Sequence, residues 1–500
     1  MMALKWKLTD FLSNKSLKVL FQTKILSPET NKIIIRCLST TDEQKREFNP
    51  KWHLTISKKK RQPPPVTAEN QYEMVAKSTT PLYDIPYEEQ LKIKTKYMQY
   101  VLKTLANQLL HNHKGLKLQS LVDHIGDCDG LAGPLEAIKP SPVITGYRNK
   151  DEMSIGEDVN GNLVAGHLVG NYMFKSESPT CVQICRLINV KDSHKLIAKL
   201  YNRFLTKTRF PVCNHFGDGG HWHSIKIRSN LENETMFIVR FHPQKLSEDQ
   251  IELAKEELRE FFISGEGSVC NLSSLYFQTC WKVKCTNTES PYILLHGKPC
   301  LQETLHGYKF QISPDSFFQT NTLGAEVLYN TVRDYCELTK ESVLFDVCCG
   351  TGTIGIILSQ FVKKVVGVEK IQQAVDDAEW NTSFNNVKNA EFICAQAEGF
   401  IKVLMSRGEV SDNDDLVAVL NPGRGGLKKK LIKCIREFPA IRRVIYVTCK
   451  PKGFCFNNFK SLCQPEDKEY KGQPFLLKKA VPVDMFPQTN HCELVMQFAR

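Results

Sequence analysis

The sequence predicts an α/β protein in which residues 311–500 form a doubly wound parallel β-sheet. Short apolar runs alternate there with helical patterns, and a glycine-rich turn follows the first of them; the runs lie at 343–347, 365–369, 391–394, 416–420 and 443–447. Right-handed crossovers place such strands in one sheet with helices on both faces. Residues 140–310 are expected to form a separate domain, mixed α+β and rich in strands.

The amino-acid composition excludes some classes of protein. The chain has 500 residues, of which 42% are hydrophobic and 24% charged, close to the average of soluble globular proteins. No apolar run approaches the roughly 18–20 residues of a membrane-spanning helix, which argues against an integral membrane protein. The formal charge of +12 favours a polyanionic partner.

The 18 cysteines are scattered without a repeated short spacing. They indicate reduced thiols in an interior compartment and not a disulfide framework. Cys181 and Cys185 lack a second nearby pair, so no metal site is expected.

The first 38 residues differ from the rest of the chain because basic and apolar residues alternate there, with Asp10 and Glu29 as the acidic exceptions. This composition is typical of a mitochondrial transit peptide, and Arg36 lies where a matrix peptidase would recognise a cut after residue 38. We therefore expect localisation in the mitochondrial matrix. The alternative is a basic tail that holds RNA.

Three further segments precede the predicted sheet. Residues 39–85, with a basic run at 58–61 and prolines at 63–65, are expected to be a basic flexible linker. Residues 86–139 form a helical segment that packs on a neighbouring domain. In the central domain, a helix is predicted to begin at Ser247, with Gln250 completing a capping box.

Basic residues lie on or beside the predicted central strands, next to the aromatic residues Tyr147 and Trp222. The predicted RNA contacts in this domain are Arg148, Lys150 and Arg228. Cationic and aromatic side chains together suit phosphate contact and base stacking. The alternative is a solvated strand face.

The glycine-rich turn at 348–355 joins the first predicted strand to a helix. Gly350 and Gly352 allow a tight turn and the close approach of a ligand. Glu369 ends the next strand, 23 residues after Asp346, near the spacing of an acid that binds ribose hydroxyls. The turn therefore predicts an adenosine-like ligand, and a dinucleotide fits its spacing equally well.

Two later strands end in polar residues that should gather at the same sheet edge. Asn421 and Arg424 follow the strand at 416–420, and Cys449 follows the strand at 443–447. A hydride-transferring enzyme does not need a thiol at this place, whereas an enzyme that transfers a methyl group to an unreactive carbon does.

The motifs together resemble the RNA (uracil-5-)-methyltransferase family, and much of the chain is similar to its vertebrate mitochondrial branch. The matching segments are 317–321, 346–352, 421–424, 447–451 and 491–493. The resemblance implies a Rossmann-like methyltransferase domain at 311–500 with S-adenosyl-L-methionine as cofactor. It also implies an RNA partner, a tRNA T-loop uridine or a mitochondrial 12S-type rRNA, and we expect a monomer that binds no metal or membrane.

The family pattern assigns roles to individual residues. Cys449 is the nucleophile and Glu493 the proton acceptor, while Arg424 or Lys450 favours the thiolate and Arg424 also contacts RNA. Such a pair suffices because a thiolate added to C6 of uracil makes C5 nucleophilic, and a base must then remove the C5 proton. The cofactor-contacting positions are Gln319, Glu369, Asn421, Gly350 and Gly352.

The sequence departs from the family pattern at two site positions. Asn421 stands where the family usually has Asp, and Lys450 where it has Asn. Two other functions therefore stay open. An RNA N-methyltransferase would use the Asn421-Pro422 turn and need no covalent thiol, and a non-catalytic RNA-binding or folding factor would keep the sheet with weakened chemistry.

Overall fold

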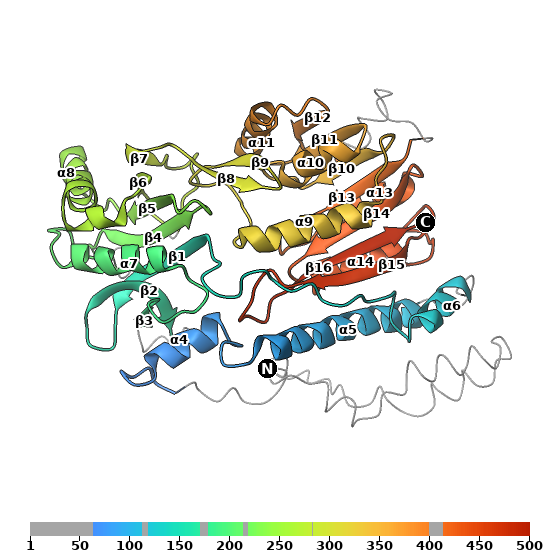
Figure 1. Cartoon of the computed structure of the whole chain (residues 1–500), viewed down its shortest axis with the longest axis horizontal. Helices are drawn as coiled ribbons and strands as arrows, with labels where there is room; N and C mark the ends of the chain where they lie inside the picture. The colour runs from blue at the N-terminus through green and yellow to red at the C-terminus, as the bar shows by residue number, and fades with distance from the viewer. Residues whose placement is uncertain (1–63, 113–118, 171–178, 214–218, 283, 400–413) are drawn as a thin grey trace, which may run out of the picture.

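The computed structural model describes residues 64–112, 119–170, 179–213, 219–282, 284–399 and 414–500. The expected leader at 1–38 and most of the expected linker lie outside the described residues. Two seven-stranded sheets form the centres of two domains, the central one drawn in green and the C-terminal one in orange and red (Figure 1). Across the described part of the chain, no helix has both the length and the apolar character that crossing a membrane requires.

A helix occupies part of the expected linker. It is α4 (Gln71–Thr79), and its Val75 and Ala76 are buried in the core of the central domain. Arg186 also lies over the ring of Tyr72, at 4.2 Å from the ring centroid. The prediction of a flexible linker is therefore wrong from residue 71 onward, because these few apolar residues share one helix face and bury it.

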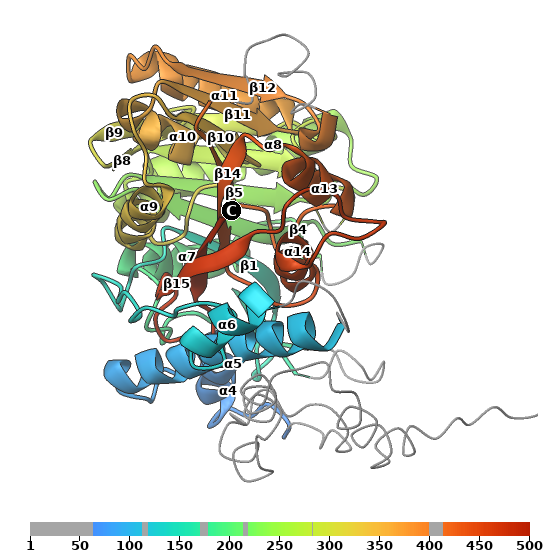
Figure 2. The ribbon, with the colours of Figure 1, turned by 90° about the vertical axis from the view of Figure 1, so that its right-hand side faces the viewer.

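The helical segment that follows packs along the C-terminal domain. It consists of α5 (Tyr87–Asn112) and α6 (Gln119–Asp127). Met98, Leu102 and Leu105 of α5 are buried against strands and helices from the last third of the chain. Figure 2 shows both helices below that sheet. Helices α5 and α6 are thus part of the C-terminal domain in space, although the central domain separates them from it in sequence.

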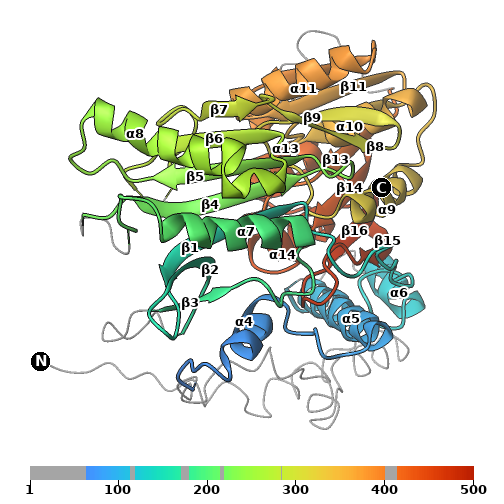
Figure 3. The same ribbon diagram turned by 60° about the vertical axis from the view of Figure 1, so that its left-hand side comes forward.

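The central sheet has the strand order β3-β2-β1-β4-β5-β6-β7. Its strands are β1 (Lys150–Glu157), β2 (Leu163–Val169), β3 (Thr180–Gln183), β4 (Trp222–Ser229), β5 (Thr235–Phe241), β6 (Ser274–Thr279) and β7 (Ile293–Gly297). All neighbours are antiparallel except β5 and β6, which α8 (Glu248–Arg259) connects. Ser247 and Gln250 form the capping box of α8. With α7 (Asp192–Leu205), α8 covers one face of this sheet (Figure 3).

A disulfide joins Cys280 to Cys285 after β6. The prediction that the cysteines are all reduced thiols is therefore wrong for this pair. The two cysteines are five residues apart, so the disulfide closes only a short loop. No repeated cysteine spacing in the sequence indicated it.

The boundary between the two domains lies earlier than residue 310. The hairpin of β8 (Leu301–Leu305) and β9 (Tyr308–Ile312) packs its apolar side into the C-terminal core, together with α9 (Thr322–Cys336). The predicted boundary at 310/311 falls inside β9. It is therefore wrong, and lies too late in the sequence by about the length of this hairpin.

The C-terminal sheet is doubly wound, as predicted. Its order is β12-β11-β10-β13-β14-β16-β15, with the strands β10 (Val343–Val347), β11 (Lys364–Glu369), β12 (Ala390–Cys394), β13 (Leu416–Leu420), β14 (Ile441–Thr448), β15 (Leu476–Val483) and β16 (Glu493–Ala499). The covering helices include α10 (Thr353–Leu358), α11 (Gln372–Phe384), α13 (Lys429–Glu437) and α14 (Phe454–Cys463). Figure 2 shows α9 and α10 on one face and α13 and α14 on the other.

The end of the chain adds the feature that matters most for the site. The first five strands of this sheet are mutually parallel, but β16 inserts antiparallel between β14 and β15. The start of β16 therefore lies beside the end of β14. This arrangement brings two distant sequence motifs to one edge of the sheet.

Candidate active site

The glycine-rich turn connects β10 to α10 in a conformation that depends on its glycines. Gly350 and Gly352 have positive φ angles of 56° and 75°. A side chain at Gly352 would come within 2.8 Å of the Phe392 ring, whereas one at Gly350 would meet nothing within 4 Å. Gly352 thus permits tight packing inside the domain, and Gly350 exposes backbone to open space.

Asp346 of β10 fixes the glycine-rich turn by a hydrogen bond. Its Oδ2 accepts a hydrogen bond of 2.9 Å from the Gly355 amide, and its Oδ1 has no partner among the described residues. Burial raises the pKa of Asp346 to about 7, the Gly355 amide opposes this shift, and Glu369 adds to it. A buried, unpartnered carboxylate oxygen beside a glycine turn suits a ligand that donates hydrogen bonds.

Glu369 faces the same turn from the end of β11. Its Oε2 accepts from the Gly350 amide at 3.3 Å, and its Oε1 accepts from the Lys370 and Ile371 amides at 2.8 and 3.2 Å. These bonds fix a carboxylate at the carboxyl edge of the sheet, where ligands of doubly wound folds bind.

Gln319 and Asn421, the other two predicted cofactor contacts, are each held by a hydrogen bond of their backbone. Gln319 is buried, and its carbonyl accepts from Asn149 Nδ2 at 2.8 Å. Against the larger effect of burial, the Gln319 side chain lowers the pKa of the Tyr329 hydroxyl on α9. Asn421 follows β13, and its backbone amide donates to the Val347 carbonyl at the end of β10.

Tyr329 is a site residue that the sequence reasoning missed. It is buried, and its pKa is raised by burial and further by Asp346 and Glu493. The charges of Asp346 and Glu493 thus both act on the Tyr329 hydroxyl. Its place in a helical pattern gave no local signal, because an apolar helix face accepts tyrosine readily.

Cys449 directly follows β14, and Glu493 begins β16, the antiparallel neighbour of β14. The β14–β16 register pairs Val447 with Val495 and Thr448 with Leu494, and one step further along the two strands come Cys449 and Glu493. Residues directly opposite in such a pair have Cβ atoms about 4.5–5.5 Å apart. The thiol and the carboxylate therefore share one edge of the sheet, on the side of the glycine turn.

Arg424 joins this pair electrostatically. Burial and the Glu493 charge raise the pKa of the Cys449 thiol, while a hydrogen bond and the positive charge from Arg424 lower it. Glu493 is fully buried, so burial raises its pKa to about 8, again opposed by Arg424. Of the two cations proposed from the sequence, Arg424 is the one that acts on the thiol.

The loop that carries Arg424 is fixed to the start of α14. The Leu427 amide donates to Asn458 Oδ1 at 2.8 Å, and Asn458 Nδ2 donates to the Leu427 carbonyl at 2.9 Å. A side chain at Gly426 would meet the backbone of Phe454 and Cys455 at 2.9–3.0 Å. Phe454, by contrast, points outward and is 71% exposed.

The predicted RNA contacts of the central domain are largely structural. Arg228 is only 2% exposed, and its guanidinium donates to the Ser313 and Ser316 carbonyls at 2.6 and 2.8 Å. The prediction of RNA binding by Arg228 is therefore wrong, because this side chain ties β4 to the segment leading to Gln319. The expected stacking partners Tyr147 and Trp222 are buried as well.

Arg148 and Lys150 are partly exposed but paired with acids. Arg148 Nε donates to Asp151 Oδ1 at 2.7 Å, and Lys150 Nζ lies 3.2 Å from Glu152 Oε1. Their contact with RNA stays a prediction. Within the part of the chain that the structure describes, no three His, Cys, Asp or Glu side chains gather as a metal site requires.

Comparisons with known proteins identify the family of the chain. The family model for tRNA (Uracil-5-)-methyltransferase matches residues 295–499. The human tRNA (uracil-5-)-methyltransferase homolog B is 41% identical over 431 residues, covering 86% of this chain and 84% of that protein. The human homolog A is 37% identical over 440 residues, covering 87% of this chain and 68% of that protein.

A solved structure shares the fold. The tRNA (uracil-54, C5)-methyltransferase of Pyrococcus abyssi, in complex with S-adenosyl-L-homocysteine, aligns with a TM-score of 0.57 and 23% identity, covering 84% of this chain and 85% of that one. The identity to these human relatives, over most of the length of both chains, shows that the chain belongs to the tRNA (uracil-5-)-methyltransferase family.

Proposed function

We propose that the protein methylates C5 of uridine in RNA, with S-adenosyl-L-methionine as methyl donor, through a transient bond between Cys449 and C6 of the base. The observation that carries the proposal is the meeting of Cys449, Arg424 and Glu493 at one edge of the sheet. A thiol, a cation that favours its ionised form, and a buried carboxylate are the three groups that this chemistry needs.

The residues around the glycine turn fit the cofactor. Glu369 would bind the ribose hydroxyls, Gly350 leaves room for the methionine portion, and the free Oδ1 of Asp346 offers an acceptor. Asn421 follows β13, the neighbour of β14, and so lies on the side towards Cys449. Gln319 is assigned to the cofactor by the family pattern. When bound there, the sulfonium group supplies an electrophilic methyl group.

The chain's own residues account for the remaining steps. The Cys449 thiolate adds to C6 and pushes electrons towards C5 and O4, and C5 then takes the methyl group. Glu493 removes the proton from C5, and the electron pair of that bond expels the thiolate. A pKa of about 8 gives Glu493 a greater proton affinity than an ordinary carboxylate, which suits it to this removal.

The RNA would approach the exposed side of this edge. Arg424, Lys450 and Lys452 are exposed there, and Phe454 follows them on the surface. Cations with an exposed aromatic ring suit single-stranded RNA, and the target uridine must leave its stack to reach Cys449. We therefore infer that this surface, Arg424 with Lys450, Lys452 and Phe454, replaces the central strands as the principal RNA contact near the target base.

A covalent adduct is the most direct test. Glu493→Gln protein is incubated with S-adenosyl-L-methionine and an unmodified tRNA transcript, and protein–RNA adducts are counted after denaturation. We expect a stable adduct that is absent in Cys449→Ser. Complete methylation by Cys449→Ser would overturn the proposal and favour an N-methyltransferase, and cofactor binding without methyl transfer to any uridine RNA would favour a non-catalytic factor.

We also propose a mitochondrial matrix location and a tRNA T-loop uridine or 12S-type rRNA as target. The basic, acid-poor residues 1–38 support the location. Import into isolated mitochondria should shorten the chain at residue 38, and an unprocessed, protease-sensitive chain would contradict it. Mapping 5-methyluridine in both RNA classes after depletion of the protein identifies the target.

A further inference from the structure

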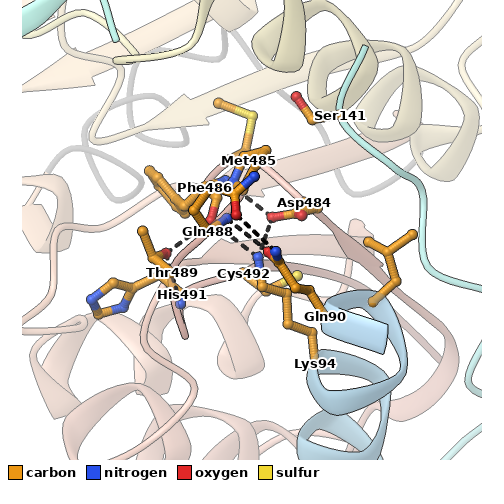
Figure 4. Close-up of polar contacts among 12 residues, drawn as sticks. Gln90, Lys94, Ser141, Asp484, Met485, Phe486, Gln488, Thr489, His491 and Cys492 are labelled. Atoms are coloured by element: carbon orange, nitrogen blue, oxygen red, sulfur yellow. Dashed lines mark hydrogen bonds and ion pairs between the residues drawn. The ribbon is translucent and has the colours of Figure 1, made fainter. Parts of the chain in front are cut away.

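The turn between β15 and β16 delivers Glu493 to the site, and α5 holds that turn. Lys94 of α5 donates from Nζ to Asp484 Oδ1 at 2.6 Å and to the Phe486 carbonyl at 3.0 Å (Figure 4). The side chains of Lys94 and Asp484 are 1% and 0% exposed. The ion pair is therefore sealed from water between the helix and the turn.

Two more side chains of α5 hold the same turn. Tyr87 donates to Asp484 Oδ2 at 3.0 Å, so both oxygens of this carboxylate are used. Gln90 donates to Gln488 Oε1 and accepts from the Gln488 amide, both at 2.8 Å. Tyr87, Gln90 and Lys94 lie on one face because they are three and seven residues apart on a helix.

The opposite side of the turn contacts the segment that leads from Gln319 into α9. Asn321 Nδ2 donates to the Met485 carbonyl at 3.2 Å, and Asn321 Oδ1 caps α9 by accepting from the Gly324 amide at 2.9 Å. Asn321 comes two residues after Gln319. The turn is thus fixed between α5 and this segment, and its last residues, His491 and Cys492, lead directly into Glu493.

Stability alone does not account for the buried ion pair. Removing two charges from water costs several kcal/mol, and well-packed apolar residues of similar volume often stabilise a protein as much or more. The lysine and the aspartate instead constrain the geometry, because Lys94 Nζ must contact both Asp484 and the Phe486 carbonyl. This geometry fixes the path of the backbone towards Glu493.

We infer that the Lys94–Asp484 pair is a positioning device for Glu493, so that α5 completes the catalytic centre from outside the family-matched residues 295–499. The inference rests on the proposed function, in which Glu493 removes the C5 proton after methyl transfer. A displaced Glu493 leaves the Cys449–C6 bond and the transferred methyl group in place, and slows only the release of the product.

The test measures two rates in the full-length protein with a tRNA transcript. One is methyl transfer in a single turnover, and the other is the decay of the denaturation-resistant adduct. For Lys94→Met and Asp484→Asn we expect adduct decay to slow about tenfold or more, with methyl transfer changed less than about threefold. Lys94→Arg, which keeps the charge and the donors, should restore much of the decay rate.

Two control variants separate positioning from general damage. Leu105→Ala loosens the packing of α5 without touching the turn, and Lys92→Met removes an exposed charge on the same helix. Neither should prolong the adduct. Wild-type decay in Lys94→Met or Asp484→Asn, or equal prolongation in Leu105→Ala, would overturn the inference. Absence of any adduct in Glu493→Gln would instead reject the proposed function, so the two failures are distinguishable.

Discussion

The two sheets use basic side chains in opposite ways. In the central sheet, Arg228 and Lys226 are buried and donate to backbone carbonyls of the segment at 313–316. At the edge of the C-terminal sheet, Arg424 is exposed and acts on Cys449 and Glu493. A positive charge on a strand therefore says little about function until its burial is known. In this methyltransferase, the central charges hold the site together, and the C-terminal charge takes part in it.

Replacing Arg228 by Leu should have the largest effect on stability and little on RNA contact. The two carbonyls lose a charged donor inside the protein, and the free energy of unfolding should fall by about 2–4 kcal/mol. Chemical denaturation measures this loss, and the salt dependence of RNA binding should be unchanged in the folded fraction. If Arg228→Leu instead reduced the salt dependence of RNA binding without lowering the stability, Arg228 would be an RNA contact and not a structural residue.

Replacing Arg424 by Gln should change the pH dependence of the reaction. In the wild type, kcat should rise with pH through about 8, because Cys449 must lose its proton for methyl transfer and Glu493 must lose its proton for product release, and burial raises both pKa values. Arg424 lowers both pKa values, so its loss moves this rise to higher pH. We expect about 100-fold less activity at pH 7 and partial recovery at pH 9.

The control for this variant is Arg424→Lys, which keeps a positive charge and should stay closer to the wild-type profile. An Arg424→Gln profile with the wild-type midpoint would show that the residue contacts RNA without affecting the thiol or the carboxylate.

Replacing Phe454 by Ala should have the smallest effect and should concern RNA alone. A stacked base contributes about 1–3 kcal/mol, so KM for RNA should rise about tenfold with kcat changed less than threefold. Val269 of the central domain is 68% exposed and provides the matched control, for which Val269→Ala should leave KM unchanged. Equal effects of both changes would indicate that RNA contacts the two domains alike.

Local signals were sufficient for much of the C-terminal domain. The alternation of strands and helices, the glycine turn and the residues at the strand ends are each encoded within about ten residues, and they predicted the sheet and its active edge. Gln319, Glu369 and Asn421 are assigned from short motifs that can be recognised without their surroundings, and their contact with the cofactor stays a prediction. Tyr329 was missed because a tyrosine in a helical pattern carries no such local mark.

Sequence patterns are enough to predict the order of strands along the chain and the tight turn at Gly350 and Gly352. Three other features follow only from the folded chain: β16 enters antiparallel beside β14, Arg228 is covered by residues some 85 positions later, and α5 holds the turn before Glu493. The reason is physical. Backbone conformation follows from neighbouring residues, whereas burial and strand adjacency depend on which distant surfaces exclude water together.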